Sequence, residues 1–520
     1  MRPDPLRPAA LVGAALLATL LAAPAWTPAL AQDSEGPVLR ISTPFPFTRL
    51  DPMLEIGNFY VFGAGELLMR FEPDGEIVPW VLAGLENVDE THWRMSLRPD
   101  VTFQNGTPLT AEALAAMLTY VVANSSAAQG YFPSDSTFEV TGESEVTFSS
   151  ETPFPALPGL LADRFVMPVF DLDAYLAAPD TSEGLAGLGL LTAPYTIESI
   201  SDDRMVLTRN ENYWQGEPAL AGVTVEFVRD TNASVLALQN GELDIASFMP
   251  LAIKPLVDAT PGLHFQDGGA DRSLFRYYQA FMNVAESPLD DPQVRFALID
   301  AIDYEEIADV VFEGVYGVAN GFYAPLHPFA LANQATDTVE AERLLDAAGW
   351  TPGADGLRQR DGETLELVAL YNPGLADLTR MGTAMQDQLR RVGIGFSLVP
   401  VDDAYTAVYQ MDWDLALYAH STTAVPETFL HRHVTPDGDR NFAGYSNDEI
   451  NALVDTLTVT IPEDERNAIL VRIQEILLEE DPYIFNLAFF QNPLAVTDAY
   501  AHVQPGFDLR LIDWQTAPGE

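Results

Sequence analysis

The chain has 520 residues, among which 76 acidic residues outnumber 26 basic ones to give a formal net charge of −50, and it contains no cysteine. A protein this acidic repels nucleic acid and anionic lipid, so neither is expected as a partner. Without cysteine the chain can form neither a disulfide nor a thiolate metal site, and it lacks the lipidated N-terminal cysteine that tethers many exported bacterial proteins to a membrane.

The first 31 residues are typical of a cleaved secretory signal. Two arginines precede an apolar run over 9–23, and the small-x-small pattern at 29–31 suits a signal peptidase. A membrane anchor is the alternative, but a spanning helix needs about 20 apolar residues and prolines cut this run short. We therefore expect cleavage before Gln32, a location in the periplasm, no lipid and no membrane anchor.

The mature chain would keep 489 residues, since 31 of the 520 are removed. One hydrophobic core stops growing at about 250–300 residues, so we expect at least two lobes. The removed segment holds two basic residues and one acidic residue, which leaves 24 basic and 75 acidic residues. The acids are spread along the whole chain and Lys254 is the only lysine, a pattern that suggests adaptation to high salt, where self-repulsion is screened. An acidic surface without a salt requirement is the alternative.

Short β-rich runs alternate with amphipathic helices along the mature chain, and this alternation favours an α/β fold. The clearest runs of strand-forming residues are 223–228, 365–370, 395–401 and 413–419. Helices are expected to begin after the capping residues Asp291, Asp303 and Ser446. A last helix is expected over 462–480, where apolar residues recur on one face that should pack in the core.

Enzyme signatures are absent from the sequence. It has no phosphate-binding G-x-x-x-x-G-K-[ST] loop, no G-x-G-x-x-G turn, no G-x-S-x-G elbow and no H-E-x-x-H helix. We therefore expect a binding protein and not an enzyme, with an exported hydrolase as the alternative of another class. His420, His431 and His433 are three of the seven histidines and could hold nickel, zinc or copper, the alternative being that each is a structural histidine.

Three groups of segments carry a resemblance to a known family. The most specific is 93–112, WRMSLRPDVTFQNGTPLTAE, in which Thr110 can cap a helix and Glu112 favours its dipole. The other groups comprise 193–195, 209–214 and 239–245, and then 291–298 and 341–350. Together they resemble the family 5 extracellular solute-binding proteins of ABC importers, the binders of peptides, dipeptides and nickel complexes.

The resemblance implies a two-lobed α/β fold of the periplasmic-binding-protein type (type II, in its large family 5 form), with a hinge between the lobes. Lobe I would comprise 32–280 and 486–520 and contain a subdomain in its first half, and lobe II would comprise 281–485. The lobes would close over a small solute and deliver it to the permease subunits of the importer, so that the chemistry is binding and release. The protein would act as a monomer without a resident cofactor, and chelated nickel would enter only as a ligand.

The predicted solute depends on a stretch of lobe II around Thr422. Peptide binders of the family hold the free α-amino group with an aspartate shortly before a proline, since a buried ammonium needs a paired charge. Counting back from Pro426, this position is Thr422, a neutral hydroxyl, and Thr423 follows it. Peptide-like solutes are the first expectation, because they are the larger group, and a nickel chelate or opine-like metallophore is the alternative.

The nickel-importer branch of the family resembles this chain at 74–80 and at His420. Its members grip a carboxylate-bearing chelator with arginines, one of which would align near Arg164, where a bidentate guanidinium suits a carboxylate. A surface ion pair is the other interpretation of Arg164. By position, Phe59 and Tyr60 could line the same pocket, with core packing as the alternative.

Overall fold

The computed structural model describes residues 36–520 with gaps at 48, 74, 180–181, 270–275, 422–424, 507 and 520, and without the side chains of 182, 183, 420 and 421. The predicted signal segment and the predicted site residues Thr422 and Thr423 lie outside the described residues. Within the described part of the chain, no helix is both long enough and apolar enough to span a membrane.

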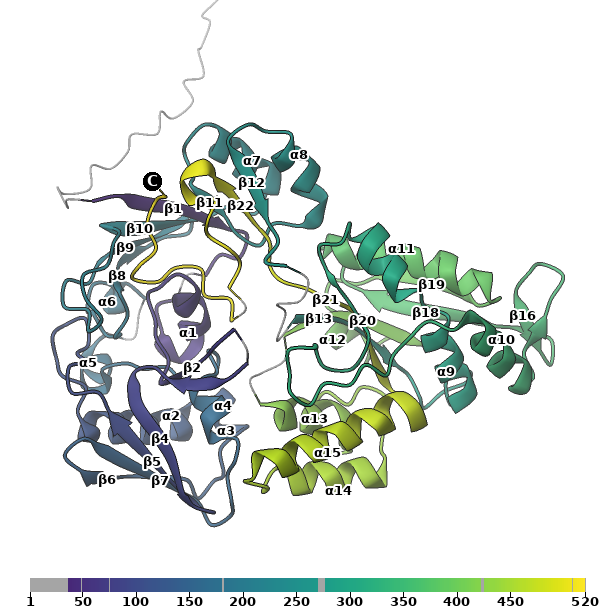
Figure 1. The fold of residues 1–520 in the computed structure, drawn as a ribbon, viewed down its shortest axis with the longest axis horizontal. Coiled ribbons are helices and arrows are strands. Elements are labelled where there is room, and N and C mark those ends of the chain that lie inside the picture. The colour runs from purple at the N-terminus through teal and green to yellow at the C-terminus, as the bar shows by residue number, and fades with distance from the viewer. Residues whose placement is uncertain are drawn as a thin grey trace, which may run out of the picture. The chain divides into compact units, whose positions relative to one another are not determined.

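A seven-stranded mixed sheet organises the part of the chain that we call the first lobe (Figure 1). Its strands, in spatial order, are β12 (Leu263–Gln266), β22 (Leu494–Thr497), β11 (Ile245–Ala246), β1 (Val38–Thr43), β10 (Gly222–Phe227), β9 (Arg204–Arg209) and β8 (Tyr195–Ile200). The central β1 is parallel to both of its neighbours, and the other pairs are antiparallel. Leu39 and Ile41 on one face of β1 and Ser42 on the other are buried, as expected for a central strand covered on both faces.

The first half of the first lobe also contains a four-stranded antiparallel sheet. The sheet comprises β4 (Leu82–Asp89), β5 (His92–Leu97), β7 (Glu145–Ser149) and β6 (Thr137–Gly142), and a short hairpin of β2 (Met69–Phe71) and β3 (Ile77–Pro79) precedes it. Helix α2 (Ala111–Asn124) packs on this sheet and begins as predicted, because the Thr110 side chain accepts a hydrogen bond from the amide of Ala113.

A six-stranded mixed sheet organises the second lobe (Figure 1). Its strands are β14 (Gly317–Val318), β21 (Ile484–Phe489), β13 (Arg276–Met282), β20 (Leu415–Ser421), β18 (Glu366–Tyr371) and β19 (Gly395–Pro400). A small three-stranded sheet consists of β15 (Thr351–Pro352), β16 (Arg358–Arg360) and β17 (Glu363–Thr364). Strands β10, β18, β19 and β20 coincide with the four predicted strands to within two residues.

The helices of the first lobe, besides α2, are α1 (Pro52–Val61), α3 (Ser126–Gln129), α4 (Leu157–Leu161), α5 (Leu172–Ala177), α6 (Ser182–Leu185), α7 (Thr231–Gln239) and α8 (Lys254–Asp258), with 3-10 turns at Leu251–Ile253 and Asp498–Tyr500. Those of the second lobe are α9 (Pro292–Asp300), α10 (Thr338–Ala347), α11 (Ala376–Arg391), α12 (Ala404–Ala407), α13 (Pro426–Val434), α14 (Asp448–Leu457) and α15 (Glu463–Glu475), with π-helical segments at Glu306–Val311 and Ile476–Glu480.

Two of the three predicted caps are confirmed. Asp291 accepts a hydrogen bond from the Gln293 amide at the start of α9, and Asp303 accepts one from the Glu306 amide. Helix α14 begins one residue later than predicted, because the Asn447 side chain accepts hydrogen bonds from two backbone amides and takes the place of Ser446. The predicted last helix is confirmed as α15, with its final turn widened into a π-helix.

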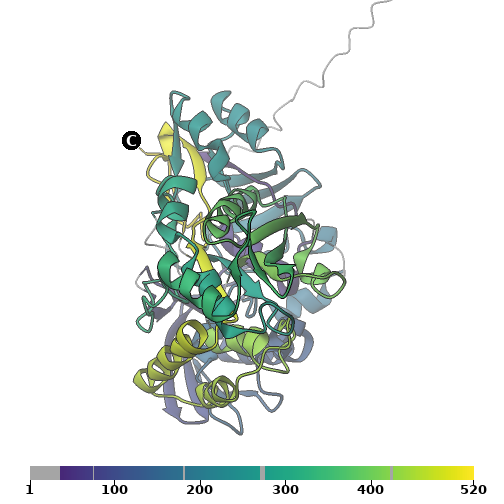
Figure 2. The same ribbon diagram turned by 90° about the vertical axis from the view of Figure 1, so that its right-hand side faces the viewer.

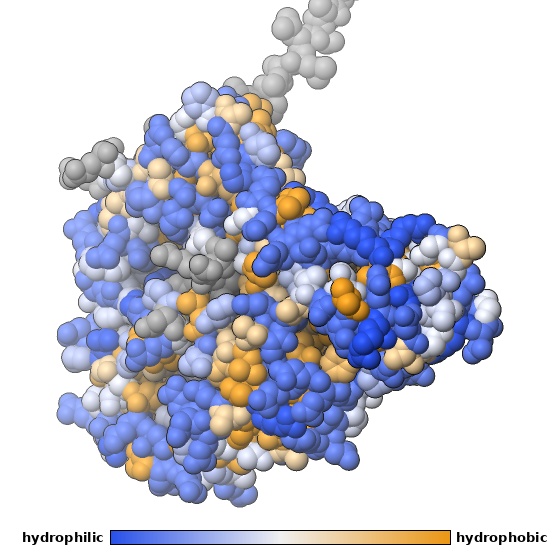
Figure 3. All heavy atoms as spheres, turned by 45° about the vertical axis from the view of Figure 1, so that its right-hand side comes forward, coloured by the Kyte–Doolittle hydropathy of each residue, from blue (hydrophilic) through white to orange (hydrophobic). Residues whose placement is uncertain are grey.

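The chain crosses between the two sheets twice. One crossing joins β12 to β13 and the other joins β21 to β22, where the yellow C-terminal segment passes from one lobe to the other (Figure 2). The predicted boundaries after 280 and 485 therefore fall inside β13 and β21, a few residues from the crossings. Each sheet has its own large hydrophobic core. The visible face in Figure 3 is mostly hydrophilic, in agreement with the acidic composition.

Candidate functional site

Arg164 lies in a turn that directly follows α4, and Asp163 fixes the backbone there. The Oδ1 atom of the buried Asp163 accepts a hydrogen bond of 2.8 Å from the amide of Phe165. This turn places the guanidinium carbon of Arg164 4.1 Å from the centre of the Phe165 ring, a cation–π contact. The Nη1 atom of Arg164 also donates a hydrogen bond of 3.4 Å to the carbonyl oxygen of Gly57 in α1.

Phe165 presents an apolar surface next to the Arg164 guanidinium. Its side chain is 53% exposed, which is unusual for a phenylalanine that neighbours a core helix. Helix α1 approaches the ring so closely that a Cβ atom at Gly57 would lie 2.9 Å from its Cε1. A half-exposed ring beside a partly exposed guanidinium offers both the apolar wall and the polar group of a solute site.

Arg276, the first residue of β13, supplies a second guanidinium. Its carbonyl oxygen accepts a hydrogen bond of 3.1 Å from the amide of Phe490, and its guanidinium carbon lies 4.7 Å from the centre of the Phe490 ring. The Phe490 ring is itself stacked on Tyr278, with 4.2 Å between ring centres and 15° between ring planes. Arg276 therefore rests on a pair of stacked rings and remains partly exposed.

The two guanidiniums are close enough to interact electrostatically. The pKa of Arg164 is lowered to about 10, first because of burial and second because of the positive charge of Arg276. Asp163, Asp508 and Tyr60 act on this pKa in the opposite direction without cancelling the shift. Burial also lowers the pKa of Arg276. Among the described residues, no carboxylate lies within ion-pair distance of Arg164.

Their lowered pKa values distinguish Arg164 and Arg276 from other arginines in the described part of the chain. Acidic neighbours raise the pKa of six other arginines, namely Arg40, Arg343, Arg391, Arg432, Arg472 and Arg510. In so acidic a protein this is the expected direction. For Arg164, no carboxylate among the described residues lies within ion-pair distance, so its lowered pKa departs from that direction.

The predicted wall residues Tyr60 and Phe59 are both in α1 but have different surroundings. The Tyr60 hydroxyl donates a hydrogen bond of 2.5 Å to Oδ2 of Asp508, and burial raises the pKa of Tyr60. Asp508 and Tyr60 both act on the pKa of Arg164, so Tyr60 lies near the guanidinium. Phe59 is fully buried against Phe47 in the core of the first lobe and offers no surface to a solute.

The three predicted metal-binding histidines are only partly described. The backbone of His420 lies on β20 opposite Tyr277 of β13, while nothing of its side chain is described. His431 is half-exposed on α13, with Nε2 3.7 Å from Oδ2 of Asp437. His433, two residues on, is buried in the core; its Nδ1 donates a hydrogen bond of 2.9 Å to the carbonyl of Phe429.

The structure does not bring His431 and His433 to one metal site. Two residues apart on a helix, they point in different directions, one to solvent and one to the core. Burial lowers the pKa of His433 to about 3, so its ring is neutral at physiological pH. Among the described residues, no group of three or more histidine, aspartate or glutamate side chains is placed to hold a metal ion.

Sequence reasoning missed the polar cluster beneath Arg276. Asp377, at the start of α11, is buried and accepts hydrogen bonds from the hydroxyls of Tyr316 at 2.7 Å and Tyr278 at 3.3 Å. The sequence hints at Arg276 only because basic residues are rare in this chain and Arg276 lies close to the predicted lobe boundary after 280. Nothing in the sequence links Asp377 to it.

The two lobes also contact each other through α13. The hydroxyl of Tyr131, which follows α3 in the first lobe, interacts electrostatically with the guanidinium of Arg432. Arg432 in turn makes two hydrogen bonds of 2.7 Å to the carboxylate of Asp439. Val425, just before α13, is buried with the core residues of the first lobe. Binding that involves both lobes is therefore coupled to this contact.

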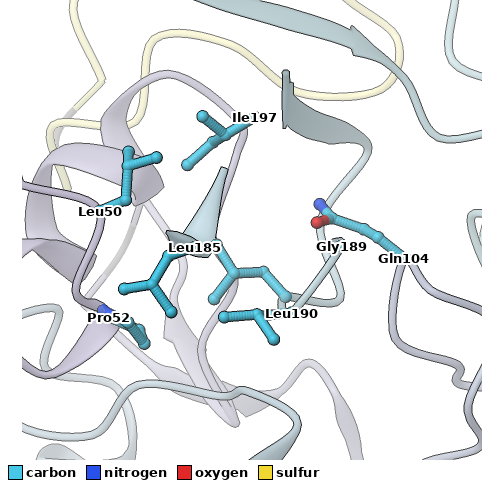
Figure 4. A pocket seen from close by; sticks show the side chains of 8 residues that line it. Leu50, Pro52, Gln104, Leu185, Gly189, Leu190 and Ile197 are labelled. Atoms are coloured by element: carbon cyan, nitrogen blue, oxygen red, sulfur yellow. The ribbon is translucent and has the colours of Figure 1, made fainter. Parts of the chain in front are cut away.

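A separate small pocket lies within the first lobe (Figure 4). It is lined mainly by leucines, together with Pro52, Ile197 and Gln104. The Gln104 amide nitrogen donates hydrogen bonds to the carbonyls of Ala193 and Tyr195, so it serves to join local segments. None of the lining residues belongs to the arginine site.

Comparison with known proteins identifies the family. A model of the family "Bacterial extracellular solute-binding proteins, family 5 Middle" matches residues 76–441. The nickel-binding periplasmic protein of Escherichia coli is 26% identical over 379 residues, covering 69% of this chain and 70% of that protein. The glutathione-binding protein GsiB of Salmonella typhi is 25% identical over 416 residues, covering 76% and 77%.

Among solved structures, that of NikA from Brucella suis in complex with Fe(III)-EDTA superposes with a TM-score of 0.81 at 22% sequence identity, covering 93% of this chain and all of that one. This likeness confirms the two-lobed α/β fold expected from the sequence. Proteins of the family bind small solutes outside the cytoplasm and work with the permease components of ABC importers; they are carriers and not enzymes. The chain belongs to the family 5 extracellular solute-binding proteins.

Proposed function

We propose that the protein captures a small peptide-like solute by holding a carboxylate of that solute on Arg164, and that it delivers the solute to an importer permease. The observation that carries this proposal is the partly exposed Arg164 guanidinium, which has no carboxylate within ion-pair distance among the described residues. A planar guanidinium binds a carboxylate with two parallel hydrogen bonds. The exposed Phe165 ring beneath it would pack against the apolar part of the solute.

A chelated metal is the second candidate, and the relatives favour it. A nickel-binding protein is among the matched relatives, and the superposed NikA structure holds an iron chelate. A chelator such as EDTA or citrate presents carboxylates that Arg164 could grip in the same way. The proposal of a peptide-like solute also has a relative in its favour. The GsiB relative is named a glutathione-binding protein, and glutathione is a tripeptide.

Several finer expectations belong to this proposal. The protein would be exported by a signal segment cleaved before Gln32, would carry neither a lipid nor a membrane anchor, and would act as a monomer. Support for the first point comes from the apolar run at 9–23 and the small residues at 29–31. Mass spectrometry of the exported protein would give its first residue, and light scattering would give its mass in solution.

Thermal-shift screening against di- to octapeptides, glutathione, opines, and nickel with histidine or with citrate tests the proposal. A bound solute raises the melting temperature because it binds only the folded state. If none of these compounds does so at millimolar concentration, the proposal fails. Stabilisation by a nickel complex but by no peptide would select the second candidate.

Arg164→Ala should then weaken binding of the identified solute by about 1.5–3 kcal/mol, the range for a hydrogen bond to a charged group. Arg360→Ala is the matched control, since Arg360 also lies over an aromatic ring, 4.4 Å from the centre of Trp350, and donates to one backbone carbonyl. It belongs to the small sheet of β16 and should leave affinity unchanged. Equal affinities of Arg164→Ala and wild type in calorimetry would remove Arg164 from the site.

A further inference from the structure

We propose that Asp508 accepts a cationic group of the solute, so that the site binds a zwitterion with its ammonium group on Asp508 and its carboxylate on Arg164. This inference rests on the proposed function and adds the chemical class of the solute. Both residues belong to the first lobe, Arg164 in the turn after α4 and Asp508 in the C-terminal segment after β22.

Arg164 and Asp508 contact helix α1 one turn apart. The Nη1 atom of Arg164 donates to the carbonyl oxygen of Gly57 at 3.4 Å, and a Cβ atom at Gly57 would point towards the Phe165 ring. The Tyr60 hydroxyl, three residues further along α1, donates to Oδ2 of Asp508 at 2.5 Å. Residues three apart lie on the same face of a helix. The guanidinium and the carboxylate therefore adjoin one face of α1, and the effect of the Asp508 charge on the pKa of Arg164 agrees with this placement.

The fold holds the Asp508 carboxylate in place before any solute arrives. The backbone amide of Arg510 donates to its Oδ1 atom at 3.1 Å. Leu509, between the two, has a φ of +70°, a left-handed conformation that is rare for a bulky residue and costs free energy. The Leu509 side chain is buried in the core of the first lobe, which stabilises this turn. A carboxylate fixed in this way binds a ligand with little loss of side-chain entropy.

The carboxylate of Asp508 has room for a cationic donor. Each carboxylate oxygen can accept about two hydrogen bonds, and the described residues donate one to each oxygen of Asp508. Among these residues, no arginine, lysine or histidine nitrogen lies within ion-pair distance of Asp508, which is partly exposed. The guanidinium of Arg510 lies instead over the ring of Trp80, 5.6 Å from its centre.

These two charges suit a solute that carries both opposite charges. An ammonium group has three donors and needs a negative partner when it leaves water, and a carboxylate needs a positive one. Asp508 and Arg164 supply one of each, and neither has an ion-pair partner among the described residues. A zwitterion would therefore satisfy both side chains at once through charge-assisted hydrogen bonds.

Calorimetry with matched peptides tests this inference. The probes are glutathione and alanylalanine, each compared with its N-acetyl form, which lacks the ammonium group. The wild type should bind at least one unmodified peptide about tenfold more tightly than its N-acetyl form, because acetylation removes the charge that Asp508 accepts. Asp508→Asn keeps the size of the side chain and an oxygen for Tyr60. It should weaken binding of the unmodified peptide about tenfold or more and that of the N-acetyl form less than about twofold.

Two further variants serve as comparisons. Arg164→Ala should weaken the unmodified peptide but keep its preference of about tenfold over the N-acetyl form, since the acceptor of the ammonium group is intact. Asp498→Asn is the matched control, because Asp498 also lies after β22 and its Oδ1 atom is 2.7 Å from Nε2 of His264. This control should behave as the wild type.

The outcomes separate the inference from the proposed function. If a peptide binds and Arg164→Ala weakens it, while acetylation or Asp508→Asn leaves its affinity unchanged, only the role of Asp508 is overturned. If no peptide binds the wild type, the proposal of a peptide-like solute fails and the inference fails with it. Should Asp508→Asn not fold, Tyr60→Phe removes the hydroxyl that positions Asp508. It should reduce the preference for the unmodified peptide about threefold or more, and an unchanged preference would overturn the inference.

Discussion

We predict that the contact between Tyr131 and Arg432 helps the two lobes to retain a bound solute. The hydroxyl of Tyr131 and the guanidinium of Arg432 come from different lobes, and Asp439 fixes the guanidinium by two hydrogen bonds of 2.7 Å. The contact between Tyr131 and Arg432 can exist only while the lobes are together. Tyr131→Phe removes this hydroxyl and keeps the ring, so it should destabilise the closed arrangement and leave each lobe intact.

The size of the effect follows from the surroundings of the contact. Both side chains are partly exposed, so water replaces much of what is lost, and the loss falls below the range of about 1.5–3 kcal/mol for a hydrogen bond to a charged group. We expect a loss of about 1 kcal/mol, which corresponds to about fivefold in affinity. The change should lie in the dissociation rate of the solute, because the contact forms after the solute has bound.

Stopped-flow kinetics with the solute identified by screening measures this rate. Tyr131→Phe should release the solute about fivefold faster and associate at an unchanged rate. Tyr120→Phe, in α2 of the same lobe, is the control, since the Tyr120 ring packs on Tyr175 within the first lobe. A Tyr131→Phe variant that releases the solute at the wild-type rate would show that this contact does not hold the lobes closed.

Two further predictions concern stability. Burial lowers the pKa of His433 to about 3, below its unfolded value of about 6.5, so the neutral ring stabilises the fold above pH 6.5 and this contribution is lost as pH falls towards 3. Chemical denaturation should show a loss approaching about 1.4 kcal/mol per pH unit below pH 6.5, unaffected by His431→Gln; a flat profile between pH 6.5 and 5 would refute it. The net charge of −50 predicts that 1 M NaCl raises the melting temperature above its value in 0.05 M NaCl, since salt screens self-repulsion. A melting temperature that does not rise would contradict the proposed adaptation to salt.

The fold was predictable because its signals are local. The strand at 395–401 and the cap of α2 by Thr110 depend on residues adjacent in the chain, and the structure confirms both. The cap of α14 shows the limit of such signals. Ser446 and Asn447 are both good capping residues, and only the three-dimensional path of the chain decides which side chain meets the free amides.

The candidate site was predictable only in part, because its contacts join distant residues. Arg164 could be proposed from a family resemblance, but the surroundings of Arg276 depend on β13 meeting β21, more than 200 residues further on. The histidines show the converse. His431 and His433 are close in sequence and were a reasonable metal pair, yet the helical rotation between them sends one ring into the core beside Phe429.

In a chain this acidic, it is informative whether an arginine has an acidic partner. With 76 acidic residues available, an arginine that serves only structure is readily paired, and pairing raises its pKa, as at Arg40 and Arg432. The pKa of Arg164 departs in the other direction, first because of burial, and no carboxylate among the described residues lies within ion-pair distance of it. Free energy favours placing an acid beside each cation, so an arginine without one suits the binding of an anion. Under the proposed function, a carboxylate of the solute would supply this negative charge when the solute binds.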